Sequence, residues 1–142
     1  MLSVTIRGVM AGAGLLAALA ATGAASQTPD ITGVWLTGSG DSRVKISPCG
    51  GAWCGTIVWT RSGAKDVHNP DPAKRDRSLT GVQMISGMKR GGDGNYSGQL
   101  YNPMDGKTYT GKLQPASASE LQLKGCVMGG LICKSQTWKR VQ

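Results

Sequence analysis

Short apolar and β-branched runs recur along the chain after residue 30, and clusters of Gly, Pro, Asn, Asp or Ser separate each run from the next. This spacing is typical of an antiparallel meander, because alternating helices and strands need longer segments with a helical period. The pattern predicts about eight strands. They fall at residues 31–37, 42–48, 53–60, 82–89, 96–101, 107–113, 120–126 and 132–141.

Turn chemistry supports this order of strands. Asp105-Gly106 lies between two strand-like runs, and Asp-Gly supplies the positive φ angles that a two-residue hairpin turn needs. The Gly-rich run at 91–95 and Gly129-Gly130 are further turn signals. Turns of this kind join strands that are neighbours in space.

A sheet of about eight short strands has to protect its edges, and closure into a barrel protects them completely. We therefore predict an all-β fold, a small antiparallel up-and-down β-barrel. A barrel of this size has room for a filled core or for one small ligand. The chain has no Phe, only 5% aromatic residues and 22 Gly, and this shortage of large side chains favours a narrow cavity.

The N-terminal residues 1–26 differ from the rest of the chain. They contain one basic residue, Arg7, then an apolar stretch at 9–21 and a run of small residues at 23–26. This is the pattern of a cleavable signal peptide, and the apolar stretch is shorter than the roughly 20 residues of a membrane-spanning helix. We expect residues 27–142 to form one exported domain, periplasmic or secreted, with no membrane span.

The chain is basic, with 16 Lys and Arg against 8 Asp and Glu, for a net charge of +8. This balance favours acidic partners such as an envelope polyanion, anionic lipid head groups or an acidic small ligand. Nucleic acid is not expected in the compartment that a signal peptide indicates. No phosphate-binding glycine motif occurs, so we expect no nucleotide cofactor.

The four cysteines form two close pairs, Cys49 with Cys54 and Cys126 with Cys133. In an oxidising compartment such residues form disulfides in preference to zinc sites, and neither pair has the Cys-x-x-Cys spacing of a redox motif. Three connectivities are open from sequence alone. The short spacing and the turn within each pair favour local pairing, with no metal site.

One polar, proline-rich segment at 61–80 interrupts the strand pattern. Proline removes a ladder donor, so we interpret this segment as an ordered excursion at a barrel mouth, here called the 61–80 excursion. Its basic residues would attract anionic ligand groups, although a charge run is usually a solvated surface. The candidate ligand-binding residues in it are Asp71, Lys74, Arg75 and Arg77.

Further candidates flank the Asp-Gly turn. Tyr101 and Tyr109 are either a cross-strand aromatic pair or, if they point inward, hydroxyl donors in a cavity. Asp71 and Asp105 would act as acid and base if the fold brought them together, although both have a sufficient explanation as turn residues. His68 is the only histidine, which excludes triads and multi-histidine metal sites.

Two terminal motifs, Gly33-Val34-Trp35 and the run TWKR at 137–140, resemble the closing elements of lipocalin-like, or calycin, barrels. The resemblance implies that Trp35 and Trp138 belong to the barrel closure. It also implies that Arg140 or Lys139 covers the Trp35 indole, a cation–π contact worth about 0.5 to 2 kcal/mol.

A longer series of motifs, in order over nearly all of the expected mature chain, resembles the DUF2147 family of exported bacterial proteins. This resemblance implies a calycin-like barrel and brings no catalytic residues. Two departures are Lys134, where Arg is usual, and Ser78, where Pro is usual; the first weighs against any role that needs a bidentate guanidinium. The motifs are CG at 49–50, WCGTIVW at 53–59, NPDP at 69–72, YNPMDGKTY at 101–109 and the stretch 125–138 ending in CKSQTW.

The combined interpretation is a non-enzymatic exported barrel that binds a small amphipathic or anionic ligand. An alternative is an envelope-associated interaction or structural protein with a filled barrel, which uses its basic surface on a protein partner or a polyanion. The third is a small hydrolase using Asp71 and Asp105. A large open cavity would favour the first, and a packed interior the second.

Overall fold

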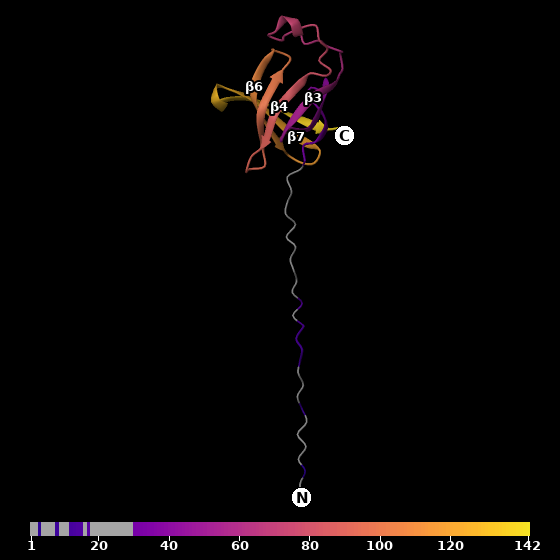
Figure 1. Cartoon of the computed structure of the whole chain (residues 1–142), viewed down its shortest axis with the longest axis vertical. Helices are drawn as coiled ribbons and strands as arrows, with labels where there is room; N and C mark the ends of the chain where they lie inside the picture. Colours follow the sequence, from indigo (N-terminus) through magenta and orange to yellow (C-terminus); the bar gives the residue numbers. More distant parts are fainter. Residues whose placement is uncertain (1–2, 4–7, 9–11, 16, 18–29) are drawn as a thin grey trace.

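The computed structural model describes residues 3, 8, 12–15, 17 and 30–142 (Figure 1). The expected signal peptide at 1–26 lies mostly outside the described residues and stays a prediction. The barrel domain is described from Asp30 to Gln142.

Eight strands form a closed antiparallel barrel in which each strand pairs with the next along the chain and the last pairs with the first. The predicted all-β barrel is confirmed, and every predicted strand boundary agrees with the structure within two residues. The strands are β1 (Gly33–Leu36), β2 (Ser42–Cys49), β3 (Ala52–Thr60), β4 (Gln83–Arg90), β5 (Tyr96–Asn102), β6 (Lys107–Pro115), β7 (Glu120–Val127) and β8 (Ile132–Arg140).

Because neighbouring strands run in opposite directions, their connections gather at two ends of the barrel. We call the end where β1 begins and β8 ends the closed end, and the end with the 61–80 excursion the open end (Figure 1). The closed end holds the segments 30–32, 50–51, 91–95, 116–119 and 141–142. The open end holds the segments 37–41, 61–82, 103–106 and 128–131.

The closed half of the barrel is filled by large side chains. Trp35 and Trp138 are 1% and 0% exposed, and the aliphatic side chains around them are almost as completely buried. Alternate residues of each strand point inward, so one apolar face per strand is enough to build this core. The aliphatic and thioether side chains of the hydrophobic core include Val44, Ile46, Ile57, Met88, Leu113 and Leu121.

Arg140 closes the barrel over this core. Its guanidinium carbon lies 4.3 Å from the centre of the Trp35 ring, as the lipocalin-like resemblance implies. The same group donates hydrogen bonds to the carbonyl oxygens of Ala118 (2.6 Å), Thr32 (2.6 Å) and Asp30 (2.5 Å). One side chain near the C-terminus therefore ties the N-terminal segment to the connection between β6 and β7.

The turn between β5 and β6 differs from the predicted two-residue hairpin. Asn102 pairs with Lys107, which leaves a connection of four residues. The Asn102 side chain accepts a bond from Met104 N (3.0 Å), and Asp105 accepts one from Lys107 N (2.9 Å). These side-chain bonds stabilise a longer turn in which Gly106 alone has a positive φ, of 70°.

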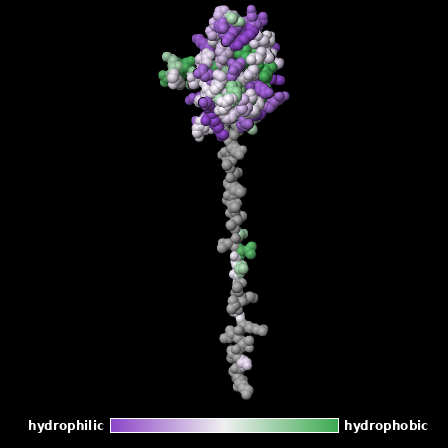
Figure 2. All heavy atoms as spheres, in the orientation of Figure 1, coloured by the Kyte–Doolittle hydropathy of each residue, from purple (hydrophilic) through white to green (hydrophobic). Residues whose placement is uncertain are grey.

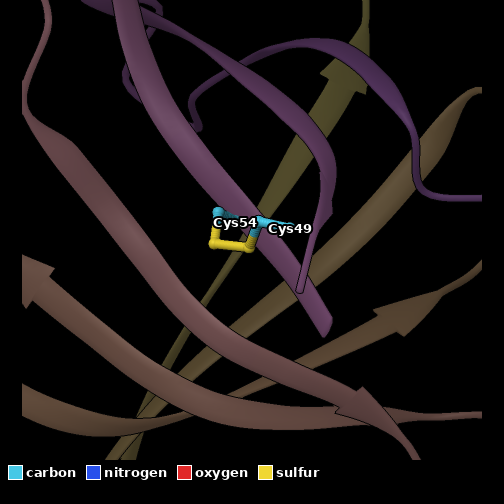
Figure 3. The surroundings of a disulfide bond; sticks show 2 residues. All are labelled: Cys49 and Cys54. Carbon is cyan, nitrogen blue, oxygen red and sulfur yellow. A yellow bond between two sulfur atoms is a disulfide. The ribbon is translucent and has the colours of Figure 1, made fainter. Parts of the chain in front are cut away.

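Both disulfides are local, as the spacing favoured. Cys49–Cys54 joins β2 and β3 at the closed end (Figure 3). Cys126–Cys133 joins β7 and β8 at the open end, where these two cysteines are also direct partners in the ladder. Each end of the barrel therefore has one cross-link between adjacent strands.

The 61–80 excursion is ordered, as expected. Lys65 and Ser78 form an isolated antiparallel bridge, and a short 3₁₀ turn, η1 (Pro72–Lys74), lies between them. Leu79 is buried and packs against the core. The excursion is thus a folded flap that extends beyond the open end (Figure 1).

Candidate functional site

A cavity of about 410 Å³ occupies the open half of the barrel. It lies there because β1 has only four residues and pairs with β8 at just two positions, so most of β8 has no strand beside it on that side. The inward side chains of β8 consequently border the opening. The cavity is lined by Met84, Leu100, Tyr101, Asn102, Asp105, Lys107, Tyr109, Leu123, Gly125, Val127, Ile132, Lys134 and Gln136.

Three paired glycines cross the barrel wall beside the cavity, and one of them leaves space. Gly98 pairs with Gly111, and Gly111 pairs with Gly125, so the row crosses β5, β6 and β7. The Leu100 side chain occupies the place that a Cβ at Gly111 would need. A Cβ at Gly125 would meet only ordinary contacts, the nearest 3.8 Å away on Tyr109. Gly125 therefore forms part of the cavity wall and leaves space beside it.

The cavity is apolar along one side and cationic along another. Lys107 and Lys134 both line it, and among the described residues neither ammonium has a carboxylate oxygen within 4.0 Å. Asp105 is the single carboxylate of the lining and accepts a hydrogen bond from the Tyr109 hydroxyl. A site with two lysines and one engaged carboxylate attracts an anionic group.

The Asp105–Tyr109 pair keeps Asp105 charged. Burial works against its ionisation, but the hydrogen bond from Tyr109 and the nearby charge of Lys107 outweigh it, so the pKa of Asp105 is lowered. The same hydrogen bond raises the pKa of Tyr109. At neutral pH the carboxylate is an acceptor and the phenol a donor, already engaged with each other.

A second polar cluster fastens the 61–80 excursion to the cavity wall. Asp66 is fully buried and accepts hydrogen bonds from Tyr101 Oη (2.5 Å), Asn69 Nδ2 (2.8 Å) and Arg77 Nε (2.9 Å). Arg77 Nη2 also lies 2.8 Å from the same carboxylate. A buried carboxylate needs this many donors to remain charged. We call these four residues the Asp66 cluster.

The Asp66 cluster shifts two pKa values in opposite directions. Burial of Asp66 disfavours its charge, yet the hydrogen bonds from Tyr101, Asn69 and Arg77 more than compensate, and the pKa of Asp66 is lowered. Burial and the Asp66 carboxylate together raise the pKa of Tyr101 to about 12. The cluster is therefore stable as a carboxylate with a neutral phenol.

Backbone contact also seats the excursion on the turn between β5 and β6. A Cβ placed at Gly106 would overlap the carbonyl of His68, and Gly106 has a positive φ as well. A residue with a side chain would be strained there and would push the excursion away. Gly106 thus allows both the turn between β5 and β6 and the close approach of the 61–80 excursion.

The predicted site residues divide into two groups. Tyr101 and Tyr109 line the cavity, although they are not a direct cross-strand pair, because the register places Tyr109 opposite Leu100 and Tyr101 opposite Thr108. Each phenol instead donates to a different carboxylate. The hypothesis that they face each other is wrong, and the role of the two hydroxyls toward a ligand stays a prediction.

The candidates of the 61–80 excursion do not line this cavity. Asp71 caps η1 by accepting a hydrogen bond from Ala73 N (3.0 Å), and Arg75 donates to the carbonyl of Asn69 (2.8 Å). Arg77 belongs to the Asp66 cluster, and Lys74 is exposed. A direct ligand role for these four residues stays a prediction. Asp71 and Asp105, the proposed hydrolase pair, do not share the cavity lining.

Sequence reasoning missed several residues that line or frame the site. Lys134 attracted notice only as a departure from a family motif, and Lys107 and Gly125 only as parts of motif strings. No feature of the sequence marks Asp66, because nothing in a polar loop sequence shows which carboxylate becomes buried. The alternation of β7 and β8 could have placed Gly125 and Lys134 on the inward face.

Metal and membrane features are limited in the described part of the chain. Within residues 30–142 there is no group of three His, Cys, Asp or Glu side chains arranged to hold a metal ion. Across the described residues, no helix reaches the length and apolarity that crossing a bilayer requires.

Comparison with known proteins agrees with this geometry. The model of the DUF2147 family, described as uncharacterized proteins conserved in bacteria, matches residues 33–140. Among solved structures, the barrel is similar to protein HP1028 from the human pathogen Helicobacter pylori, which is described as belonging to the lipocalin family. That likeness has a TM-score of 0.70 at 28% identity and covers 81% of this chain and 85% of the other. No curated protein matches the chain.

The comparisons and the disulfides together bear on fold, compartment and identity. A lipocalin-like barrel suggests ligand binding and a non-enzymatic role, without naming a ligand. Two disulfides in a bacterial protein indicate a location outside the cytoplasm. The family match spans the barrel from its first strand to its last, so this chain belongs to the DUF2147 family.

Proposed function

We propose that this protein binds a small amphipathic molecule with an anionic group, without catalysing a reaction, in the periplasm or after secretion. The observation that carries the proposal is a cavity of about 410 Å³ that combines apolar walls with two lysines, neither of which has a carboxylate oxygen within 4.0 Å in the described part of the chain. Cavities of roughly 300–1,000 Å³ with mostly apolar walls and a few polar groups are typical small-molecule sites. The similarity to a lipocalin-family structure supports the same function.

The lining suggests how such a ligand would lie. Its apolar part would contact Leu100 and Leu123, which form the inner wall next to the filled core. Its anionic group would approach Lys134 and Lys107 nearer the opening. The Tyr101 and Tyr109 hydroxyls would accept hydrogen bonds from polar parts of the ligand, because each already donates its proton to a carboxylate.

The 61–80 excursion would act before the ligand enters. Lys74 and Arg75 add positive charge around the open end, whereas the charge of Arg77 is paired with Asp66, and unpaired positive charge raises the local concentration of anions. Asp71, as the cap of η1, would hold this segment in shape. These residues therefore stay in the proposal as a frame of the mouth, while the cavity residues would bind.

The two other candidate functions have less support. A filled barrel describes the closed half well, but the open half contains the cavity. A hydrolase would need two carboxylates in one pocket, and Asp105 is the single carboxylate that lines this one. The cavity therefore favours binding over both alternatives.

Filling the cavity tests the proposal. Decanoate serves as an anionic amphipathic probe in isothermal titration calorimetry, with decanol as its uncharged counterpart. Gly125→Val would place two methyl groups in the cavity without backbone strain, so decanoate affinity should fall at least about tenfold, a loss of roughly 1.4 kcal/mol. Ser135→Val, at an exposed position of the neighbouring strand, is the matched control and should leave affinity unchanged.

Removing charge separates the ionic from the apolar part of the interaction. Lys134→Gln should weaken decanoate binding about threefold to tenfold and leave decanol binding unaltered, because only decanoate carries a charge for the ammonium to attract. If Gly125→Val binds decanoate as well as the unaltered protein does, the cavity is not the binding site and the proposal fails.

A further inference from the structure

Four exposed apolar side chains gather where β7 turns into β8, and we call them the apolar tip. Met128 is 71% exposed and Leu131 85% exposed. In Figure 2 the tip projects from the barrel as a group of hydrophobic atoms, at the position of the gold hairpin in Figure 1. Grouped apolar exposure of this kind marks a surface that contacts something else. The tip consists of Val127, Met128, Leu131 and Ile132.

The apolar tip is held in a fixed shape. The Cys126–Cys133 disulfide lies directly beneath it, and Val127 pairs with Ile132 in the next position of the ladder. Met128 has a φ of 55°, in the left-handed region that side chains other than Gly, Asn and Asp rarely adopt. The fold alone does not explain a large exposed apolar side chain at a position that glycine would fit without cost.

The hairpin that carries the tip has charge of one sign. Between residues 121 and 138 the charged residues are Lys124 and Lys134. Lys134 and Lys124 lie on the two strands of the hairpin, close below the disulfide in the ladder. Lysines beside a small apolar surface keep their ammonium groups in water while their stems cover apolar area. This arrangement complements an anionic surface with an apolar layer beneath it.

The tip is continuous with the cavity. Val127 and Ile132 both belong to the tip and line the cavity. The opening of the cavity therefore lies beside whatever the tip enters. A bilayer has the required layering, because anionic head groups lie outermost and hydrocarbon lies below them.

We propose that the apolar tip docks on an anionic lipid bilayer, with Met128 and Leu131 entering the head-group region and Lys124 and Lys134 contacting anionic head groups. The docking is peripheral and reversible, because one hairpin tip buries little area. It brings the cavity opening to the level of the lipid. Docking depends on the tip and its lysines and does not require that the cavity bind a ligand.

Vesicle flotation tests the proposal. Protein purified after export is mixed with vesicles of phosphatidylcholine alone or with about one third phosphatidylglycerol, so that surface charge varies while hydrocarbon does not. The double variant Met128→Asp, Leu131→Asp should bind the phosphatidylglycerol vesicles at least about tenfold more weakly, since each buried side chain is worth roughly a tenfold change. Raised salt should weaken binding of the unaltered protein.

A matched control carries the same charge change elsewhere. Val58→Asp with Val141→Asp replaces two exposed apolar residues that lie outside the tip, and it should keep vesicle binding. All three proteins share one N-terminus, so any contribution from that segment cancels. All four substituted positions are exposed, so the fold should persist, and circular dichroism checks that it does.

The outcomes divide clearly. Loss of flotation in the tip variant alone, together with dependence on phosphatidylglycerol, supports the proposal. Equal flotation of all three proteins, equal binding to uncharged vesicles, or no flotation of the unaltered protein overturns it. So does a dimer that forms through the tip, seen in sedimentation velocity, without vesicle binding.

Discussion

At the closed half of the barrel, the inward positions of β7 and β8 carry Leu121 and Trp138, whereas the same strands carry Gly125 and Lys134 at the open half. The pairing of β7 with β8 runs unbroken from one half to the other. Along these two strands the difference therefore comes from side-chain size and charge at alternate positions.

Strand β7 shows the change in its four inward residues. Leu121 is completely buried, Leu123 is 3% exposed and lines the cavity, Gly125 leaves space and Val127 reaches the apolar tip. One strand thus passes from core to cavity to surface without any break in the ladder. A barrel can therefore contain a binding site where a few neighbouring strands carry small inward side chains, while large inward side chains keep the other half packed.

The largest expected effect comes from truncating leucines in the two halves. Leu121→Ala should cost roughly 2–5 kcal/mol of unfolding free energy, because it opens a void in a packed core. Leu123→Ala should cost about half as much, since one side of this leucine already faces the cavity and its removal enlarges an existing space. Urea denaturation measures both. Equal losses would mean that the open half is packed as tightly as the closed half.

The second comparison is between the two disulfides, and its expected effect on the free energy of unfolding is of intermediate size. Replacing either pair by serine should cost about 2 kcal/mol, because both close short loops in the unfolded chain. Only Cys126→Ser with Cys133→Ser should also weaken decanoate binding, since it loosens the hairpin that lines the cavity. The control is Cys49→Ser with Cys54→Ser at the closed end. Equal binding by both variants would show that the open end needs no cross-link to keep its shape.

The smallest effect concerns the Asp66 cluster. Tyr101→Phe removes one donor to the buried carboxylate and should cost about 1–2 kcal/mol. The loss should be local, with faster amide hydrogen exchange in the 61–80 excursion and little change near Trp35. Thr108→Val, on the partner strand at the same register position, is a suitable control. Uniformly faster exchange over the whole barrel would contradict a local fastening role.

The pH dependence of the same cluster can be stated with its sign. The folded pKa of Asp66 lies below its ordinary value of 3.8, so its contribution to stability is present above that value and is lost as the pH falls through the lowered folded pKa. The pKa of Tyr101 is raised from 10.0 to about 12, so its contribution is present below pH 10.0 and disappears as the pH rises through about 12. At low and at high pH, the denaturation midpoint should therefore change less with pH in Tyr101→Phe than in the unaltered protein.

Features set by local chemistry were predicted well from the sequence. The strands follow from alternation between turn residues, and the local disulfides follow from short spacing in Gly-containing turns. The predicted length of the turn between β5 and β6 is wrong, because Asn102 and Asp105 stabilise a four-residue connection through their own side chains. A dipeptide signal such as Asp-Gly carries no information on side-chain hydrogen bonds of this kind.

The site was predicted only in part, for a geometric reason. Which residues line a cavity depends on the register between strands that are distant in sequence, and a shift of one residue exchanges inside and outside. Tyr101 and Tyr109 were identified by residue type, whereas Lys107 and Lys134 required the barrel to be closed before their shared lining became visible. The burial of Asp66 depends on Tyr101, which lies in another strand.

The bonds of Arg140 also bear on the order in which the barrel can form. The guanidinium that ties the N-terminal segment to the connection between β6 and β7 belongs to β8, the last strand of the barrel. These bonds cannot form until β8 is present beside β1. Non-local contacts of this kind are slow to form. The position of one arginine therefore makes closure of the barrel a late step of folding.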